Sequence, residues 1–247
     1  MYYYIMEPPK GNLVKRQEKI KDILGDLGIA GETVTPSAAR TIEELTHLGV
    51  MKGYSTIVAV GGESLVNKII NVLVTQKISK DAVLGVIPND FDTMLAKKIN
   101  VIDLRSACDA LKFRKLETID LCQVDPNKFF ITQAVIENFR NRKILFAMEG
   151  LSGSAQTNQI IIKPGLNIYI HDKALEGNAF GRFFHWLLGK KESDIYSSFF
   201  KTKKIRFELE NVNLPIKVSG ETIAKTPVTL HNRSRVLKII VARDKIR

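Results

Sequence analysis

The residues best placed to do chemistry form a glycine-rich turn, Gly61-Gly62-Glu63-Ser64. The apolar run 56–60 precedes this turn and the helical pattern 65–74 follows it, so the turn lies where a strand passes into a helix. Glycines at such a turn let backbone N–H groups approach phosphate oxygens, and the helix N-terminus adds positive potential. We interpret the turn as a phosphate-binding loop, with a simple tight turn as the alternative.

Further polar residues follow the next apolar run, 83–88, at Asp90, Asp92 and Thr93. The two aspartates would repel phosphate unless a metal sat between them, and the other interpretation is an N-cap with a solvated neighbour. Glu221 lies at a predicted β-turn, where an isolated glutamate is usually a surface residue.

The first third of the chain has the pattern of βαβ units. Apolar runs at 3–6, 56–60 and 83–88 predict buried parallel strands. Helical spacing predicts helices over 13–27, 38–52, 65–74 and 93–99, with the second opened by Thr35-Pro36-Ser37. We therefore expect an α/β domain over residues 1–107, with its candidate loop at the end of a buried strand.

From about residue 116 short strand patterns separated by turns predict an antiparallel β-sandwich domain, assigned to residues 108–247. Its predicted strands are 116–124, 129–136, 143–148, 159–162, 166–170, 204–209, 216–218, 226–230 and 236–242. One helical insertion is expected near 181–200.

Composition limits the classes of protein that fit. No apolar stretch is long enough to span a membrane, and the start lacks a secretory signal, so we expect a cytoplasmic protein. Cys108 and Cys122 are predicted to be buried, reduced thiols. Of the net charge of +11, residues 1–107 carry +1 (13 basic, 12 acidic) and residues 108–247 carry +10 (24 basic, 14 acidic). That second half suits an anionic lipid or phosphorylated partner, or is only a solvated basic surface.

An aromatic cluster inside the expected insertion is followed by lysines. Its principal members are Phe183, Phe184, Trp186, Lys190 and Lys191. Aromatic rings beside lysines suit a membrane interface, where the protein would bind peripherally at the inner membrane surface. A helix packed on the β-domain and a homodimer contact are the alternatives. Nucleic-acid binding is not expected, because base-stacking aromatics on a recognisable module are missing.

Six segments, taken in order, resemble the diacylglycerol kinase catalytic-domain family of lipid kinases. The run VAVGGESLVNKIINVL at 58–73 is similar to the family signature GGDGTLNEVVNGL, and LGVIP at 84–88 is similar to LGIIP. Residues 119–121 and 129–131 resemble the hairpin that opens the family's β-domain. PIKVSGE at 215–221 and TPV at 226–228 resemble PVQVDGE and TPV.

The resemblance implies a phosphofructokinase-like parallel α/β domain followed by a β-sandwich domain. It also implies ATP-dependent phosphoryl transfer to a lipid hydroxyl such as that of diacylglycerol, with ATP and Mg²⁺ as cofactors. Catalytic roles would pass to Glu63, acting through magnesium, and to Glu221, which would help order the site. The implied nucleotide-binding residues are Gly61, Gly62, Glu63, Ser64, Asn67, Asp90 and Thr93.

The same segments depart from the family pattern. Glu63, Ser64 and Leu65 replace Asp, Gly and Thr of the first loop. Ser64 adds a Cβ where the backbone would need positive φ, at a cost on the order of 1 kcal/mol. The Gly-Thr-Gly turn of the second loop is missing, and the ungapped alignment is preferred because it keeps 95–97 on a helix. Ser219 replaces the Asp of DGE.

These departures leave two functions open. The first is a divergent lipid kinase that binds nucleotide or a phosphorylated lipid. The second is a non-catalytic pseudokinase that uses the same loops, or the basic β-domain, to bind nucleotide, phospholipid or a protein partner.

Overall fold

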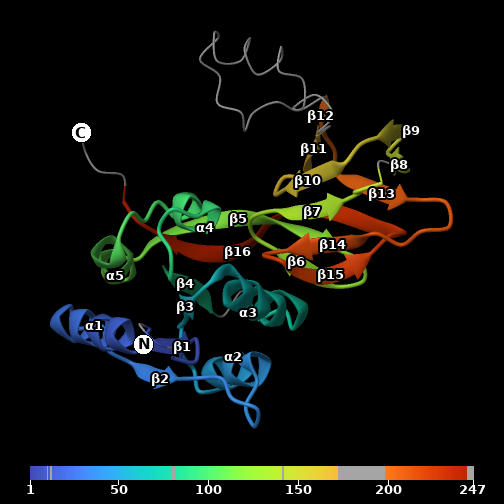
Figure 1. The fold of residues 1–247 in the computed structure, drawn as a ribbon. Coiled ribbons are helices and arrows are strands. Elements are labelled where there is room, and N and C mark those ends of the chain that lie inside the picture. Colours follow the sequence, from blue (N-terminus) through green and yellow to red (C-terminus); the bar gives the residue numbers. More distant parts are fainter. Residues whose placement is uncertain (10, 12, 79–81, 141, 172–197, 244–247) are drawn as a thin grey trace. The chain divides into compact units, whose positions relative to one another are not determined.

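The chain forms two compact units in a computed structural model, which describes residues 1–9, 11, 13–78, 82–140, 142–171 and 198–243. Unit 1 is residues 1–121 with 234–247, and unit 2 is residues 122–233. The division differs from the predicted boundary at 107/108, which falls inside a helix, because the last strand of the chain returns to the first unit. The predicted architecture of an α/β part and an antiparallel β-sandwich is confirmed (Figure 1).

Unit 1 is a parallel sheet covered by helices. Its elements in chain order are β1 (Tyr2–Met6), α1 (Leu13–Asp26), β2 (Glu32–Val34), α2 (Ile42–Met51), β3 (Thr56–Gly61), α3 (Glu63–Thr75), β4 (Val83–Pro88), α4 (Met94–Lys98) and α5 (Leu104–Phe113). The strand order is β2-β1-β3-β4, continued by the end of β16 (Val228–Val241), and each of these neighbours is parallel. Every residue of β3 and β4 is buried. Helix α2 contacts α3 and α1 contacts α5, as expected of a parallel sheet covered on both faces.

The start of α2 differs from its prediction. We expected the helix to begin near Ala38, but it begins at Ile42 with Thr41 as N-cap. The Thr41 hydroxyl accepts the Glu44 N–H, and the Glu44 carboxylate accepts the Thr41 N–H in return. This capping box satisfies two amides of the first turn, which explains why the helix starts there.

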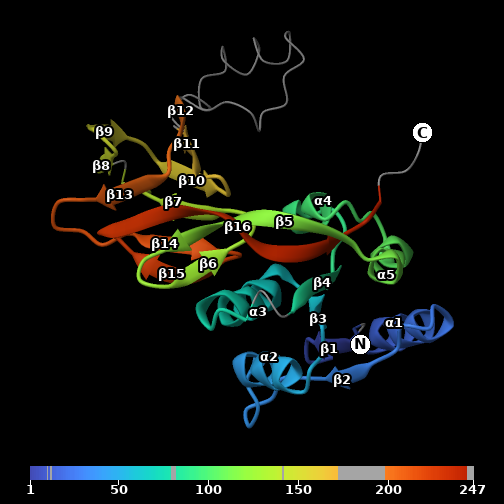
Figure 2. The ribbon, with the colours of Figure 1, turned by 180° about the vertical axis from the view of Figure 1, so that it is seen from behind.

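Unit 2 is built from two sheets. Between β5 (Lys115–Val124) and β16, both shared with unit 1, lie β6 (Lys128–Phe130), β7 (Ala134–Glu137), β8 (Lys143–Met148), β9 (Leu151–Gln156), β10 (Gln159–Lys163), β11 (Asn167–His171), β12 (Ser198–Lys201), β13 (Lys204–Glu208), β14 (Pro215–Val218) and β15 (Glu221–Lys225). One sheet contains β16-β13-β8-β9, with β5 and β6 attached, and the other has the order β12-β11-β10-β7-β14-β15. Figure 2 shows β16 and β13 from behind.

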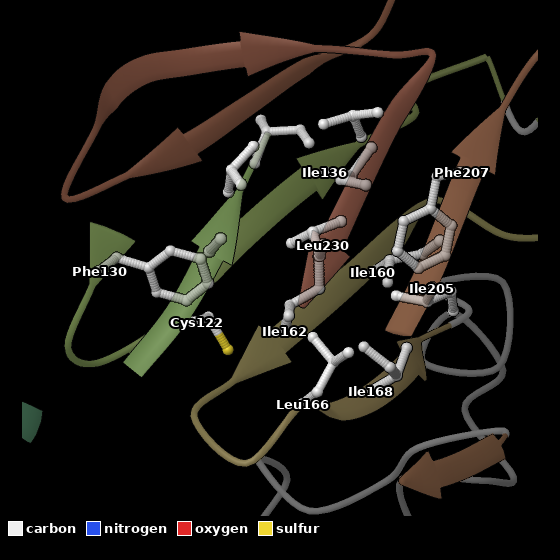
Figure 3. Close-up of a cluster of buried hydrophobic side chains, with 14 of the residues drawn as sticks. Cys122, Phe130, Ile136, Ile160, Ile162, Leu166, Ile168, Ile205, Phe207 and Leu230 are labelled. Atoms are coloured by element: carbon white, nitrogen blue, oxygen red, sulfur yellow. The ribbon is translucent and has the colours of Figure 1, made fainter. Parts of the chain in front are cut away.

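Alternating side chains fill the core between these sheets. Along β13 the residues Ile205 and Phe207 are buried while their neighbours are exposed, and β10 alternates between buried and half-buried residues. Figure 3 shows these side chains meeting Cys122, Phe130 and others in one apolar cluster. The predicted burial of both cysteines is confirmed, and both are free thiols.

The predicted helical insertion near 181–200 lies mostly outside the described residues. Its last part is described, and it is a strand: β12 pairs with β11. The extension of that helix to Phe200 was therefore wrong. β12 is the edge strand of its sheet, and three of its four residues are exposed.

Candidate functional site

The candidate loop lies at the carboxyl edge of the unit 1 sheet, where the strand order reverses. From β1 the chain goes to β2 on one side of β1 and then to β3 on the other side. The carboxyl ends of β1 and β3 are consequently neighbours. Ligands of open α/β sheets bind outside the carboxyl ends of the strands at such a point. The loop that follows β3 is therefore where this topology favours a ligand.

The carboxylate of Glu7 lies against this loop. Glu7 follows β1, and its N–H donates to the Val60 carbonyl (3.0 Å), which continues the β1-β3 ladder by one residue. The Gly62 N–H donates to Glu7 Oε1 at 2.8 Å. The Asn89 side-chain amide donates to Glu7 Oε2 at 2.6 Å. The loop thus holds an anionic group with one donor on each carboxylate oxygen.

Space rather than backbone angle explains the glycine at position 61. Neither Gly61 nor Gly62 has a positive φ, and Gly62 is extended at φ −79° and ψ 177°. A Cβ on Gly61 would lie 2.7 Å from Glu7 Cδ, whereas a Cβ on Gly62 would lie 3.4 Å from Glu7 Oε1. Gly61 is therefore the position at which a side chain would displace the carboxylate.

The expected strain at Ser64 is not found. Ser64 lies in the first turn of α3, which begins at Glu63 with Gly62 as N-cap, and its φ is not positive. The helix takes up both residues because a buried apolar face already begins at Leu65 (2% exposed). Glu63 and the Glu7 carboxylate both lie at this N-terminus, where the helix dipole favours negative charge.

Asn67 occupies the buried face of the same helix. It is 8% exposed, and its carbonyl accepts the side-chain amide of Asn71 at 2.6 Å. The backbone of Asn67 therefore serves α3 itself. Its predicted contact with phosphate stays a prediction.

The loop after β4 completes the site. The Asn89 N–H donates to the Gly61 carbonyl at 3.2 Å, so the two loops are joined by backbone as well as through Glu7. Asp90 closes a local turn in which its carboxylate accepts the Asp92 N–H. Thr93 is the N-cap of α4, its hydroxyl accepting the Ala96 N–H. The N-cap was predicted at Asp90 or Asp92 and lies at Thr93, so that prediction was wrong.

The carboxylate of Asp92 pairs with a lysine of α4. It forms an exposed ion pair with Lys97 at 2.7 Å, and this hydrogen bond lowers the pKa of Asp92. Among the described residues no group of three or more His, Cys, Asp or Glu side chains forms a metal cluster. The carboxylates of Asp90 and Asp92 therefore both have local partners, the Asp92 N–H and Lys97 respectively.

Arg16 of helix α1 supplies a cation at this edge. Its guanidinium donates to the Pro88 carbonyl at 2.7 Å and lies 5.2 Å from the centre of the Phe91 ring. Pro88 is the residue paired with Gly61 between β4 and β3. Burial lowers the pKa of Arg16, and the charge of Asp90 opposes that shift. The Arg16 Nε is buried with no hydrogen-bond partner among the described residues, so the cation has an unused donor.

Sequence reasoning did not assign Glu7, Arg16 or Asn89 to the site. A signal existed for Glu7, since it directly follows a predicted strand of the same parallel sheet as the glycine loop, and such strands end at one edge. Arg16 gave no comparable signal, because an arginine on a helix face is usually solvated.

Glu221 belongs to unit 2. It opens β15 after a two-residue turn in which Ser219 (φ 50°) and Gly220 (φ 81°) both have positive φ. Such a turn matches the twist of a β-hairpin, so the SGE segment has a structural explanation. The catalytic role of Glu221 stays a prediction.

The predicted membrane-contact residues, Phe183, Phe184, Trp186, Lys190 and Lys191, lie outside the described residues. In the part of the chain that is described, no helix is long and apolar enough to cross a membrane.

Comparison with known proteins relates the first part of the chain to a known family. Residues 4–124 match the model of the diacylglycerol kinase catalytic domain. This range contains β1, β3, β4 and each of the loops described above. No curated protein sequence matches the chain.

Solved structures share the fold along nearly the whole chain. A diacylglycerol kinase from Bacillus anthracis strain Sterne is similar with a TM-score of 0.74 and 14% identity, over 97% of this chain and 96% of that one. A second structure from the same strain, described as a candidate diacylglycerol kinase, has a TM-score of 0.76 at the same identity and coverage. Both units therefore have counterparts in a known two-part fold.

Proposed function

Residues 4–124 match the diacylglycerol kinase catalytic-domain family, and from this premise we propose that the chain is a lipid-kinase-like protein. Its loops after β1, β3 and β4 would bind the phosphates of ATP. The reaction would transfer the terminal phosphoryl group to the hydroxyl of a diacylglycerol-like lipid. Two features of the structure bear on this proposal, the hydrogen bonds to the Glu7 carboxylate and the Arg16 guanidinium.

The hydrogen bonds to Glu7 carry the proposal. The Gly62 N–H and the Asn89 amide hold carboxylate oxygens at 2.8 and 2.6 Å, at the N-terminus of α3. A phosphate presents oxygens of the same charge and hydrogen-bonding type. When the Glu7 side chain turns away, the same two donors are available to a nucleotide phosphate, with the Arg16 guanidinium at the same edge of the sheet.

The acidic residues at this edge fit a magnesium ion that arrives with the nucleotide. Magnesium in kinase sites is usually bound by one or two carboxylates together with substrate phosphates and waters, not by a complete protein cage. Glu63, at the start of α3, is the carboxylate that would hold it, because the Glu7 carboxylate takes the donors that the phosphate would need. The metal would neutralise charge on the phosphates, and the chain's own donors would orient them.

The position of Glu7 also favours a second candidate, a non-catalytic pseudokinase. A phosphate must displace a carboxylate that already has two charge-assisted hydrogen bonds, each worth about 1.5–3 kcal/mol. Since every 1.4 kcal/mol is about tenfold in affinity, this competition weakens nucleotide binding substantially. A chain that keeps Glu7 in place would use the fold to bind a partner without phosphoryl transfer.

Two measurements separate the candidates. Thermal stability is recorded with ATP and Mg²⁺, because a ligand of the native state raises stability. The protein is also incubated with labelled ATP, Mg²⁺ and vesicles that contain diacylglycerol. Labelled phospholipid that is lost in Glu63→Ala, but retained in the exposed control Glu18→Ala, supports the kinase. Stabilisation without labelled phospholipid supports the pseudokinase. The absence of both effects would overturn nucleotide binding altogether.

A further inference from the structure

An aromatic side chain projects from the connection between β7 and β8 in unit 2. Phe139 is 80% exposed, more than Phe113 (56%) or Phe199 (57%). Burying a phenylalanine side chain is worth about 1.5–3 kcal/mol, so its exposure forgoes that contribution in the isolated chain. The ring would regain that contribution if another apolar phase covered it.

The connection is held firmly at its base. Asn138 is 1% exposed, and its side-chain amide donates to the carbonyls of Arg142 (2.6 Å) and Thr157 (2.8 Å). Its backbone N–H donates to the Asn158 carbonyl at 2.8 Å. Asn138 therefore ties both ends of this connection to the connection between β9 and β10. Phe139 is presented by an ordered base, not by a loose chain end.

A groove with an apolar lining and a positive rim adjoins the ring. Its apolar lining residues are Phe139, Val212, Leu214 and Pro215. Glu137 and Lys217, also in the lining, form an ion pair at 2.7 Å and offset each other. Arg140 and Arg142 complete the rim, and within the described residues neither has a carboxylate partner. The groove therefore has two uncompensated positive charges beside exposed apolar surface.

We propose that the Phe139 surface, defined as Phe139, Arg140, Arg142 and the adjoining groove, docks the protein on an anionic lipid bilayer. Aromatic rings are favourable at the headgroup boundary, and arginines near the surface are attracted to anionic lipids. The net charge of +10 over residues 108–247 attracts the molecule to the same surface. The choice of lipid over an acidic protein rests on the proposed function, because that function needs access to a lipid hydroxyl.

Vesicle co-sedimentation tests the surface with the full chain. Vesicles of phosphatidylcholine alone are compared with vesicles containing phosphatidylglycerol. Wild type should bind the anionic vesicles preferentially. Phe139→Ala should weaken this binding by about tenfold, and Arg140→Gln with Arg142→Gln by about thirtyfold. The matched control is Leu151→Ala, which removes a 58% exposed side chain from the β8-β9 hairpin beside Glu149 and should leave binding unchanged.

The outcomes are unambiguous once thermal unfolding shows that each variant is folded. Binding of both variants at wild-type strength would overturn the Phe139 surface, as would a wild type that does not bind vesicles or binds both kinds equally. An acidic protein partner would then be the remaining explanation of the arginines. ATP binding measured without lipid reports on the loops of unit 1 alone, so failure of the nucleotide proposal is seen separately from failure of this one.

Discussion

At the scale of single residues, one carboxylate decides how the candidate site behaves. Glu7 takes the hydrogen bonds that a phosphate would need from Gly62 and Asn89. The glycines can be seen in the sequence, but the carboxylate that faces them cannot. Glu7 lies 55 positions from Gly62 and 82 positions from Asn89 along the chain. The loop could be predicted from local pattern, whereas its present occupant depends on how β1, β3 and β4 align.

Replacing Glu7 by glutamine should strengthen nucleotide binding. Glu7→Gln keeps the length of the side chain but removes the charge that competes with phosphate, so we expect ATP affinity to rise by about tenfold or more. Titration calorimetry with ATP and Mg²⁺ measures the change. Glu18→Gln, on the exposed face of α1, is the charge-matched control. Equal affinity in Glu7→Gln and wild type would show that Glu7 does not compete.

The two glycines should respond differently to alanine. Gly61→Ala forces the Glu7 carboxyl group away from its donors, and we expect the free energy of unfolding to fall by about 1.5–3 kcal/mol. Gly62→Ala, at 3.4 Å from Oε1, should cost less. Urea unfolding measures both. In the Glu7→Ala background the cost of Gly61→Ala should largely disappear, since the clash is removed, and an unchanged cost there would assign the effect to something other than Glu7.

At the scale of elements, strong apolar patterns predicted well and short or polar elements did not. The strands β1, β3 and β4 and the helices α1 and α3 were predicted to within two residues. Strand β2 has three residues and no fully buried one, so it gave no periodic signal. Strand β16 was predicted as two strands because the polar run 231–235 interrupts its apolar pattern, yet its pairing with β13 extends to His231.

The corrected start of α2 gives a prediction for its cap. Thr41→Ala removes the acceptor for the Glu44 N–H and should lower the free energy of unfolding by about 1 kcal/mol. Thr35→Ala alters the residue first predicted to open the helix and should change stability by less than about 0.5 kcal/mol. Urea unfolding of both variants compares the two starting points, and a larger loss in Thr35→Ala would contradict the capping box.

The buried thiol of α5 predicts how stability changes at high pH. Burial raises the pKa of Cys108 from 9.0 to about 11, because the charged thiolate is disfavoured in the core. A raised pKa of an acid favours the native state below the unfolded pKa, and this contribution is lost as pH rises from about 9 towards 11. Denaturant midpoints at pH 8, 9 and 10 should fall. The midpoint of Cys108→Ala should fall less steeply over that range. Parallel curves for the variant and wild type would show that the Cys108 thiol does not cause the loss of stability.

At the scale of the whole molecule, no local sequence pattern marks the positions at which the chain divides into its two units. The last strand carries residues 234–241 back to unit 1, where Ile239 pairs with Leu84. Composition changes near residue 108 because helices give way to strands, and that change was interpreted as the boundary. A return of the chain end depends on long-range pairing, which a sequence pattern does not encode.

Hydrogen exchange with and without ATP and Mg²⁺ tests how the two units share the proposed function. If nucleotide binds the loops of unit 1, amides of residues 61–67 and 89–93 should become more protected, because ordering the loops raises the free energy of local opening. The core strand β10 of unit 2 should be unaffected and is the internal control. Protection of the β14-β15 hairpin as well would support the predicted role of Glu221, whereas exchange there that ignores ATP would confine the nucleotide site to unit 1. Protection only in unit 2 would contradict the proposed site, since none of its hydrogen-bond donors lies there.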